Sequence, residues 1–466
     1  MTTENILSEN IQIEPFPMVQ LLELSINHQL NDHSYFTCLG IISEEDQVTY
    51  VSRMNQPTEI TVTKREVDGE IVTFFGGQVL DIQIHNRKNV YYLELKAASS
   101  TILLDIQERR RSFQQTDLTY EQLLQQVISP YPSSLFINTF TNNERIGQLT
   151  TQYDETTWEF MKRLVSRLGG SLVSFDQRIG SRFYFGLPKT ENKGTITAND
   201  YQLHHDFIGY QRTVQNTPHQ FLESEHSYYS IESRELYFLG DHVTFQGRNY
   251  QIIDVKRALT QSVLLNTYVL ATPTGATRRP IENEKLKGLS LNGTVQSVRG
   301  DQVQVQLDID QEFNGQTSYW FTYSTSYTSD DNIGWYMMPG VNDRVRVYFP
   351  TTDESEAYAI SSIREGDNSD LNPAIKTLKN MHGKTITLEP NQITIVGGGT
   401  SIVLNDENGV TIKSDSHVAI SGKQSISIQG DQILMDAAEQ IKLSVHHNSV
   451  TIDGQIVLSG TNVKMN

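Results

Sequence analysis

Cysteine, basic residues and long apolar runs are all scarce in this chain. Cys38 is the single cysteine among 466 residues, which excludes an intrachain disulfide framework and a cysteine-based zinc site. Lys and Arg total 37 against 55 Asp and Glu, a formal net charge of −18, so nucleic acid and anionic membranes are unfavourable partners. No stretch reaches the roughly 18 apolar residues that a membrane helix needs. The N-terminus has neither the basic start nor the apolar core of a secretory signal, so we expect assembly in the cytoplasm without a signal peptide.

Most of the sequence has the pattern of β-strands. Apolar and polar residues alternate in short runs such as LELSINHQL, SYFTCLGII, EITVTKREV and YYLELKA. Alternation of this kind places one face of a strand on a core and the other in water. The pattern predicts a mainly β protein with a few helices.

Two segments predict helices. In residues 117–129, Thr119 and Gln122 form a capping box before an apolar stripe, and Pro130 ends the segment. In residues 154–170, apolar residues recur at helical spacing from Trp158, which we expect to lie in the helix core. Glu159 and Arg163 there have the spacing of a favourable ion pair.

Composition divides the chain into segments. We predict a hub domain over 1–276, a linker over 277–288, a small barrel over 289–364, a second linker over 365–383 and a spike over 384–466. The barrel segment has five or six short strands with Gly turns, which suits an oligonucleotide/oligosaccharide-binding (OB) fold. We expect Trp335, Tyr336 and Pro339 to pack inside it. Its acidic stretches QLDIDQE and TTDESE argue against nucleic acid as a ligand.

The sequence becomes periodic from residue 384 onward. Eleven apolar-x-apolar pairs recur at steps of six to nine residues, separated by Gly, Asn, Asp, Ser and Gln. Each pair offers two side chains to one face, so a single chain has a thin, open core. The predicted trimer core of the spike is Ile386, Leu388, Ile393, Ile395, Ile402, Leu404, Val410, Ile412, Val418, Ile420, Ile426, Ile428, Ile433, Met435, Ile441, Leu443, Val450, Ile452, Ile456, Leu458, Val463 and Met465.

Three chains wound together would close a prism and bury every inward pair. This triple-stranded β-helix is favoured over a solitary parallel β-helix, whose coils have about 20–25 residues rather than eight. Two alternatives remain open, namely a β-helical polysaccharide-degrading enzyme and an adhesin shaft.

Three segments resemble the VgrG-like hub-and-spike proteins of contractile injection systems. They are LLDIQERRRSFQ at 103–114, QYDETTWEFMKRLVSRLGG at 152–170 and GWYMMPGVNDRVRVYFPTTDESEAYAISSI at 334–363, which resembles the second half of the family's OB barrel. The periodic C-terminal part resembles the trimeric spike of this family. The hub residues that match the family motifs are Leu104, Asp105, Ser112, Phe113, Gln114, Gln152, Tyr153, Glu155, Phe160, Arg163 and Leu164.

The resemblance implies an architecture and a role. Two related hub barrels with helical inserts, an OB barrel and a β-helix spike would form a homotrimer that adapts a six-fold inner tube to a three-fold spike. The spike would pierce the target envelope as part of a virion, a released particle or a secretion machine. The implied partners are the inner tube protein, other baseplate proteins, a possible effector cargo and a possible PAAR-type tip protein that contacts Val463 and Met465. One departure is Asn342, where the family often has glycine.

The sequence offers no constellation typical of an enzyme. It shows no Ser-His-Asp set, no Gly-rich phosphate loop and no HExxH motif, so we expect no catalysis and no cofactor. Adjacent strand residues face opposite sides, so His446-His447 offers at most one inward metal ligand per chain on the spike axis. We expect this pair and His204-His205 to be solvated turn residues. Arg109–Arg111 is expected to be an exposed strand-end cluster, with an acidic partner as the alternative.

Overall fold

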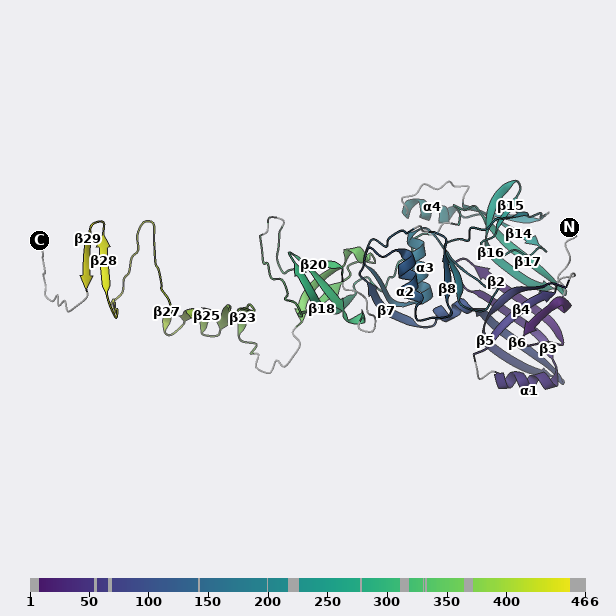
Figure 1. Cartoon of the computed structure of the whole chain (residues 1–466), viewed down its shortest axis with the longest axis horizontal. Coiled ribbons are helices and arrows are strands. Elements are labelled where there is room, and N and C mark those ends of the chain that lie inside the picture. The colour runs from purple at the N-terminus through teal and green to yellow at the C-terminus, as the bar shows by residue number, and fades with distance from the viewer. Residues whose placement is uncertain are drawn as a thin grey trace. The chain divides into compact units, whose positions relative to one another are not determined.

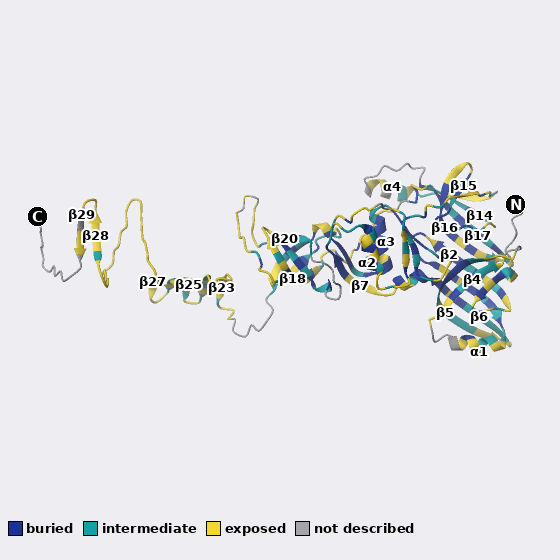
Figure 2. Ribbon diagram, in the orientation of Figure 1, coloured by how far each residue is buried: buried dark blue, intermediate teal, exposed yellow. Residues whose placement is uncertain are grey.

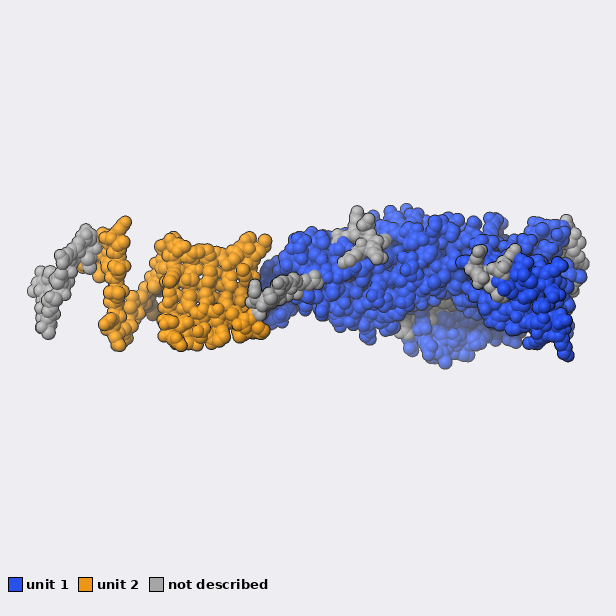
Figure 3. Space-filling view, turned by 90° about the horizontal axis from the view of Figure 1, so that it is seen from below, with its two compact units in different colours: residues 1–365 blue, residues 366–466 orange. Residues whose placement is uncertain are grey.

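The computed structural model describes residues 8–53, 57–65, 69–140, 143–198, 200–216, 226–276, 279–310, 318–329, 331, 333–363 and 372–452. The chain divides into two compact units, residues 1–365 and 366–466, coloured separately in Figure 3. The described residues are mainly β, as predicted (Figure 1). The five domain boundaries given above remain predictions.

A twelve-stranded sheet dominates the N-terminal part of the first unit. Strand β2 (Gln20–Gln29) pairs antiparallel with β16 (Arg248–Thr260), and this pairing joins the strands before the insert to the strands after it. The strands of the two predicted hub barrels therefore share one sheet. The short helices α1 (Glu44–Arg53) and α4 (Phe207–Asn216) accompany it. The strand order is β1 (Ile11–Glu14), β4 (Glu59–Arg65), β5 (Ile71–Arg87), β6 (Val90–Ser99), β3 (Ser34–Ile42), β2 (Gln20–Gln29), β16 (Arg248–Thr260), β17 (Val263–Ala271), β14 (Ser227–Ser233) and β13 (Tyr201–His205), with β15 (His242–Phe245) on β16 and β12 (Asn192–Thr195) on β15.

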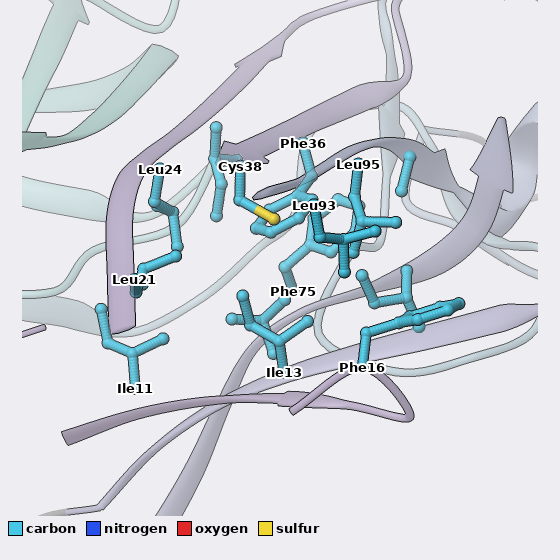
Figure 4. Packing of buried hydrophobic residues seen from close by; sticks show 14 of the residues in the cluster. Ile11, Ile13, Phe16, Leu21, Leu24, Phe36, Cys38, Phe75, Leu93 and Leu95 are labelled. Atoms are coloured by element: carbon cyan, nitrogen blue, oxygen red, sulfur yellow. The ribbon is translucent and has the colours of Figure 1, made fainter. Parts of the chain in front are cut away.

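Each half of this sheet has its own hydrophobic core. Figure 4 shows the first core, where Phe36, Cys38, Phe75, Leu93 and Leu95 converge from β3, β5 and β6. Strand β3 alternates buried residues with more exposed ones along its whole length, as the period of two predicted, whereas β5 and β6 also contain runs of consecutive buried residues. Cys38 is buried there, and burial raises the pKa of its thiol, which leaves it a packing residue rather than a nucleophile.

A smaller insert lies between the two halves in sequence. The strands β7 (Glu108–Phe113) and β9 (Thr150–Thr156) pair antiparallel beside the helices α2 (Tyr120–Ile128) and α3 (Thr157–Arg167). A second small sheet has the order β10 (Leu172–Ser174), β11 (Arg182–Phe185) and β8 (Leu135–Asn138), and a 3₁₀ turn, η2 (Ser100–Leu104), precedes β7.

Both predicted helices of the insert form. The capping box of Thr119 and Gln122 is present, and Trp158 is only 1% exposed in the core, as expected. The second helix begins at Thr157 rather than near 154, because the preceding residues continue β9 up to the cap. The predicted ion pair of Glu159 with Arg163 is wrong. The Glu159 carboxylate accepts a hydrogen bond from the backbone N–H of Thr156 instead, which completes a second capping box.

The barrel closes with five strands in the order β18 (Ser290–Arg299), β19 (Gln302–Leu307), β20 (Trp320–Ser324), β22 (Tyr358–Ile363) and β21 (Arg344–Tyr348). Leu286, from the predicted linker 277–288, is fully buried in its core, so this end of the segment is packed. Pro339 is buried as expected. The expectation for Trp335 and Tyr336 is wrong, since they are 58% and 74% exposed on the long loop between β20 and β21. This loop runs outside the barrel wall, where the Tyr336 hydroxyl donates to the Gly300 carbonyl.

The second unit contains an antiparallel meander. Its strands are β23 (Lys376–Lys379), β24 (Thr385–Glu389), β25 (Gln392–Gly397), β26 (Thr400–Asn405) and β27 (Gly409–Ser414), followed later by the hairpin β28 (Ile441–Val445) and β29 (Asn448–Ile452). Residues 415–440, where three further strands were predicted, form no strand in the single chain. The last predicted pairs, from Ile456 to Met465, lie outside the described residues. The trimeric β-helix remains a prediction.

Candidate functional site

The family-motif residues gather in one place, on β7, β9, α3 and the turn before them. There the insert meets two short 3₁₀ turns of the barrel, η4 (Asp308–Asp310) and η5 (Glu354–Glu356). We call this contact the joint. It is formed by Ser112, Gln114, Thr151, Arg163 and Arg167 on the insert side and by Asp310, Glu354 and the Val305 carbonyl on the barrel side.

The first anchor of the joint is Asp310, at the end of η4. Its Oδ1 accepts from the Ser112 backbone N–H and its Oδ2 accepts from the Ser112 hydroxyl, both at 2.6 Å. The Gln114 amide donates to the Val305 carbonyl at 3.0 Å beside this anchor. Burial raises the pKa of Asp310 although both Ser112 bonds and Gln114 oppose the rise, because no cation reaches this carboxylate among the contacts of the described residues.

The second anchor is Glu354, in η5, whose side chain is 1% exposed. Oε1 accepts from Arg163 Nη1 at 2.8 Å, and Oε2 accepts from Arg167 Nη2 at 2.6 Å. The Thr151 backbone N–H also donates to Oε1, at 3.3 Å. Burial by itself would raise the pKa of Glu354, but Arg167 and Arg163 together hold it below its usual range.

Arg163 is the centre of the charge network, with its side chain 1% exposed. Its Nε and Nη2 donate to the two oxygens of Glu155, each at 2.8 Å, and Nη2 also donates to the Thr151 carbonyl at 2.7 Å. Burial disfavours the guanidinium, yet Glu155 and Glu354 keep the pKa of Arg163 above its ordinary value. Four of the five N–H groups of this buried arginine donate to two carboxylates and a carbonyl, so the joint is specific in geometry as well as charge.

The remaining motif residues support the joint from behind. Leu104, Phe160 and Leu164 are fully buried, and Phe113 stacks on Phe160 with ring centroids 5.7 Å apart. Gln152 accepts from Arg111 Nε at 2.8 Å. The ring of Tyr153 lies under the Arg110 guanidinium, and the Tyr153 carbonyl accepts from Asn283 at 2.9 Å. Asp105 accepts from the Thr156 hydroxyl and lies 3.2 Å from His33 Nε2.

The arginine run at 109–111 is not an exposed cluster throughout. Arg110 is exposed and pairs with Asp154, but Arg111 is 5% exposed and bonded to Gln152. Burial, and then the neighbouring Arg109, lowers the pKa of Arg111 to about 10. The alternation of β7 explains the split, because successive side chains face opposite sides of the strand.

The structure brings together a Ser-His-Asp set that the sequence did not reveal. His28 Nδ1 lies 3.1 Å from Asp176 Oδ2, and His28 Nε2 lies 2.8 Å from Ser174 Oγ. All three residues are no more than 2% exposed, and the Ser174 hydroxyl donates to the Asp32 carbonyl. A serine that is closed to substrate and has a committed proton is not a nucleophile. The set ties the β2–β3 hairpin to the insert.

The other histidine pairs have separate surroundings. His204 and His205 lie on strand β13 rather than in a turn, because they pair with Tyr228 and Ser227 of β14. His446 and His447 form the exposed turn between β28 and β29. Within the described ranges, no group of three or more His, Cys, Asp and Glu side chains has the arrangement of a metal site.

The meander of the second unit presents the predicted spike residues on one face. Leu388, Ile393, Leu404 and Val410 are successive cross-strand partners in one row. The second row is Ile386, Ile395, Ile402 and Ile412. We call these eight residues the apolar face.

Exposure on this sheet is inverted relative to hydrophobicity. In β24 and β25 the apolar residues are exposed, at 39% for Ile393 and 47% for Leu388, whereas Thr387 and Thr394 between them are half-buried. Figure 2 draws the strands labelled β23, β25 and β27 in the colours of exposed and intermediate residues. A contiguous exposed apolar patch marks an interaction surface. The single chain therefore leaves uncovered the residues that its sequence pattern marks as core.

Asn342 occupies a backbone position that suits glycine. Its φ is 72°, in the left-handed region that Asn tolerates better than other side-chain-bearing residues. Its backbone N–H donates to the Val295 carbonyl at 2.8 Å, which secures the turn before β21. Asn342 thus adopts the backbone conformation that glycine favours.

The family motifs include three of the five insert-side residues of the joint, Ser112, Gln114 and Arg163, and neither of its barrel-side anchors. Asp310 and Glu354 lie in the acidic stretches QLDIDQE and TTDESE, which suggested only that the barrel does not bind nucleic acid. Their partners are 187 to 203 residues away, so nothing local marks them as buried anchors. The one available signal was their place in short turns between strands: Asp310 lies in the turn that follows β19, and Glu354 lies in the segment between β21 and β22.

Comparison with known proteins identifies the fold. No family model and no curated protein matches the sequence. Among solved structures, an Escherichia coli component of the type VI secretion system, itself similar to the T4 bacteriophage tail proteins gp27 and gp5, matches with a TM-score of 0.54. It is 13% identical, over 76% of this chain and 99% of that one. The Francisella PdpA–VgrG complex, half-lidded, matches with a TM-score of 0.55 and 10% identity, over 88% of each chain.

The chain therefore has the fold of the VgrG-like hub-and-spike proteins, as its motifs predicted. At these identities the likeness concerns the fold. None of the helices in the described part has the length and apolar character needed to span a bilayer.

Proposed function

We propose that this protein is the structural hub and spike of a contractile injection machine. In this role it adapts a six-fold inner tube to a three-fold spike, and the spike pierces the target envelope. The observation that carries the proposal is the apolar face, which stands uncovered in a chain whose first unit has the hub fold. An exposed apolar face of this kind suits association with other copies of the same chain.

The apolar face supports a homotrimer. Two rows of four apolar residues lie in register on one side of the meander, and none of the strands β24–β27 has a fully buried residue. Burial of apolar area contributes about 25 cal/mol per Å², so three such faces packed together gain what one chain cannot. Wound around each other, the three chains would continue the prism through the strands predicted beyond residue 414.

The joint supports a mechanical role for the first unit. Force applied to the barrel would pass into the insert through Asp310 and Glu354, each held by two or more hydrogen bonds. Removing one partner from such a buried network leaves an uncompensated charge, which costs several kcal/mol. The network therefore resists displacement of the barrel from the insert.

The proposed partners are the inner tube protein, other baseplate proteins, an effector cargo and a PAAR-type tip protein on Val463 and Met465. The Francisella VgrG relative forms a complex with PdpA, which supports partnership with other proteins. We further propose that the chain has no enzymatic activity and no cofactor. It is assembled in the cytoplasm and works in a virion, a released particle or a secretion machine.

The experiment that tests this function is the mass of the full chain in solution by light scattering, with an unboiled sample on SDS gels beside it. We expect a mass of three chains and an SDS-resistant band that disappears on boiling. A monomer at every concentration would overturn the proposal, because nothing would then cover the apolar face. A side-by-side dimer would contradict the three-fold arrangement.

A further inference from the structure

A pocket of about 390 Å³ lies on one face of the large sheet, away from the joint and from every motif residue. Its walls come from β2, β13, β14, β16 and β17 and the residue that follows β2. The volume falls within the range of roughly 300–1,000 Å³ in which proteins hold small ligands. Nothing in the proposed hub-and-spike role uses it.

The strand register explains why the polar residues of the pocket meet. Gln29, Asp254, Val269 and Ser230 are successive cross-strand partners on four strands, so they share one face of the sheet. The register shifts between Ile252 and Asp254, so one extra residue bulges out of β16 just before the carboxylate. Bulges of this kind redirect the side chains next to them.

Asp254 is the residue of the pocket that can bind a cation. Its Oδ2 accepts from the Gln29 amide at 3.1 Å, whereas its buried Oδ1 accepts no hydrogen bond from the described residues. Burial raises the pKa of Asp254, and Lys256, His28 and Gln29 only partly oppose this. A buried acceptor without a donor costs free energy that a ligand with N–H groups would recover. Because Gln29 is exposed, its amide can move away from Oδ2 and leave this oxygen to such a ligand as well.

The rest of the pocket suits the other parts of an alkylamine. The rings of His204 and Tyr228 stack with centroids 6.5 Å apart, and an aromatic face attracts a cation. Leu30, Ile253 and Val269 supply an apolar wall for methylene groups. Asp254 is the one carboxylate in the described lining, which is too few for a divalent metal.

We propose that this pocket binds a primary alkylammonium group. The ammonium sits on Asp254 beside the Tyr228 ring, and the methylene stem packs on the wall of Leu30, Ile253 and Val269. The ligand is either a free alkylamine or the side chain of a lysine on a partner protein. The chemistry of the two is the same, and the experiment separates them.

The test is calorimetric titration of the full chain with n-butylamine hydrochloride and, separately, with acetyl-lysine methylamide. We expect saturable binding that Asp254→Asn weakens by about tenfold or more, because a hydrogen bond to a charged group is lost. Binding of both probes identifies a lysine side chain as the ligand, and binding of n-butylamine alone identifies a free amine. Sodium butyrate, which has the same stem with an anionic head, should not bind.

Two variants keep the outcome interpretable. Asp81→Asn removes an exposed carboxylate elsewhere on the large sheet and should leave binding unchanged. Ser230→Leu fills the pocket without touching Asp254 and should abolish binding even where Asp254→Asn folds poorly. The proposal is overturned by absence of saturable binding to the wild-type chain, or by equal affinity in wild type and Ser230→Leu. Neither result bears on the trimer, whose test is the solution mass.

Discussion

The joint and the apolar face differ in whether their residues find their contacts within a single chain. In the joint, buried charges find every partner within one chain, up to 203 residues away. On the apolar face, seven of the eight residues that should form a core are 39–67% exposed, and Ile402 is half-buried. The first unit buries its charged network within one chain. The meander of the second unit leaves its apolar face exposed, which is why we propose that other copies cover it.

The largest effect is expected from a charge on the apolar face. Ile395→Asp places three carboxylates together in the proposed trimer, so we expect the solution mass to fall from three chains to one. Thr394→Asp, one residue away on the opposite face, should keep the trimer. Light scattering of both variants checks this. A normal trimer from Ile395→Asp would mean that the apolar face is not the surface that holds the three chains together.

The second prediction breaks the joint. Arg163→Ala leaves Glu155 and Glu354 without their shared cation, so the free energy of unfolding of the first unit should fall by about 3–5 kcal/mol. Urea titration followed by tryptophan fluorescence reports on this unit alone, since Trp158, Trp320 and Trp335 all lie in it.

The matched control for that change is Arg110→Ala, which removes the exposed pair with Asp154. An exposed ion pair contributes less than about 1 kcal/mol, so the loss should be small. Equal losses in the two variants would mean that burial of the joint adds nothing to its strength. The solution mass should not change in either.

The third prediction concerns acid. The pKa of Glu354 is lower in the folded state than in the unfolded chain, so its contribution is complete above pH about 4.3 and is lost as pH falls through the folded value. We expect the first unit to lose stability below pH about 4. Glu354→Gln should flatten this decline, as measured by urea unfolding at several pH values. A decline of the same steepness in the variant would assign the acid lability to other carboxylates.

Asp310 sharpens the third prediction because its pKa is shifted in the opposite direction. Burial raises its folded pKa, so protonation on mild acidification stabilises the fold through this group rather than destabilising it. The two anchors of one joint thus differ according to whether a cation reaches them.

The smallest effect is expected from Ser112→Ala. The variant loses the hydroxyl bond to Asp310 but keeps the backbone N–H bond at 2.6 Å, so the cost should be about 1–2 kcal/mol. Ser129→Ala, which removes an exposed hydroxyl at the end of α2, should cost less. Tryptophan-monitored urea unfolding distinguishes the two. A loss as large as that of Arg163→Ala would make Asp310 the main anchor.

The features that the sequence predicted correctly are those that can be read from a short stretch of residues. The capping box at Thr119, the apolar spacing that marks Trp158 as core and the alternation of β3 can be read from neighbours within a few residues, and they are confirmed. The motif residues of the insert also proved to lie together. Partners that are distant in the sequence cannot be seen in a local pattern. The spacing predicts Glu159 as the partner of Arg163, but the Arg163 guanidinium donates to Glu155 and Glu354 instead. Trp335 and Tyr336 were assigned to the barrel core by their size, although their loop runs outside the wall.

The distance in sequence between the two sides of the joint has a consequence for synthesis. Arg163 leaves the ribosome 191 residues before Glu354, which at about 5–20 residues per second is a delay of roughly 10–40 s. During that time Glu155 already neutralises Arg163, but the ion-pair partner of Arg167 does not yet exist. The insert therefore emerges with an unmatched positive charge on the surface that the barrel later covers.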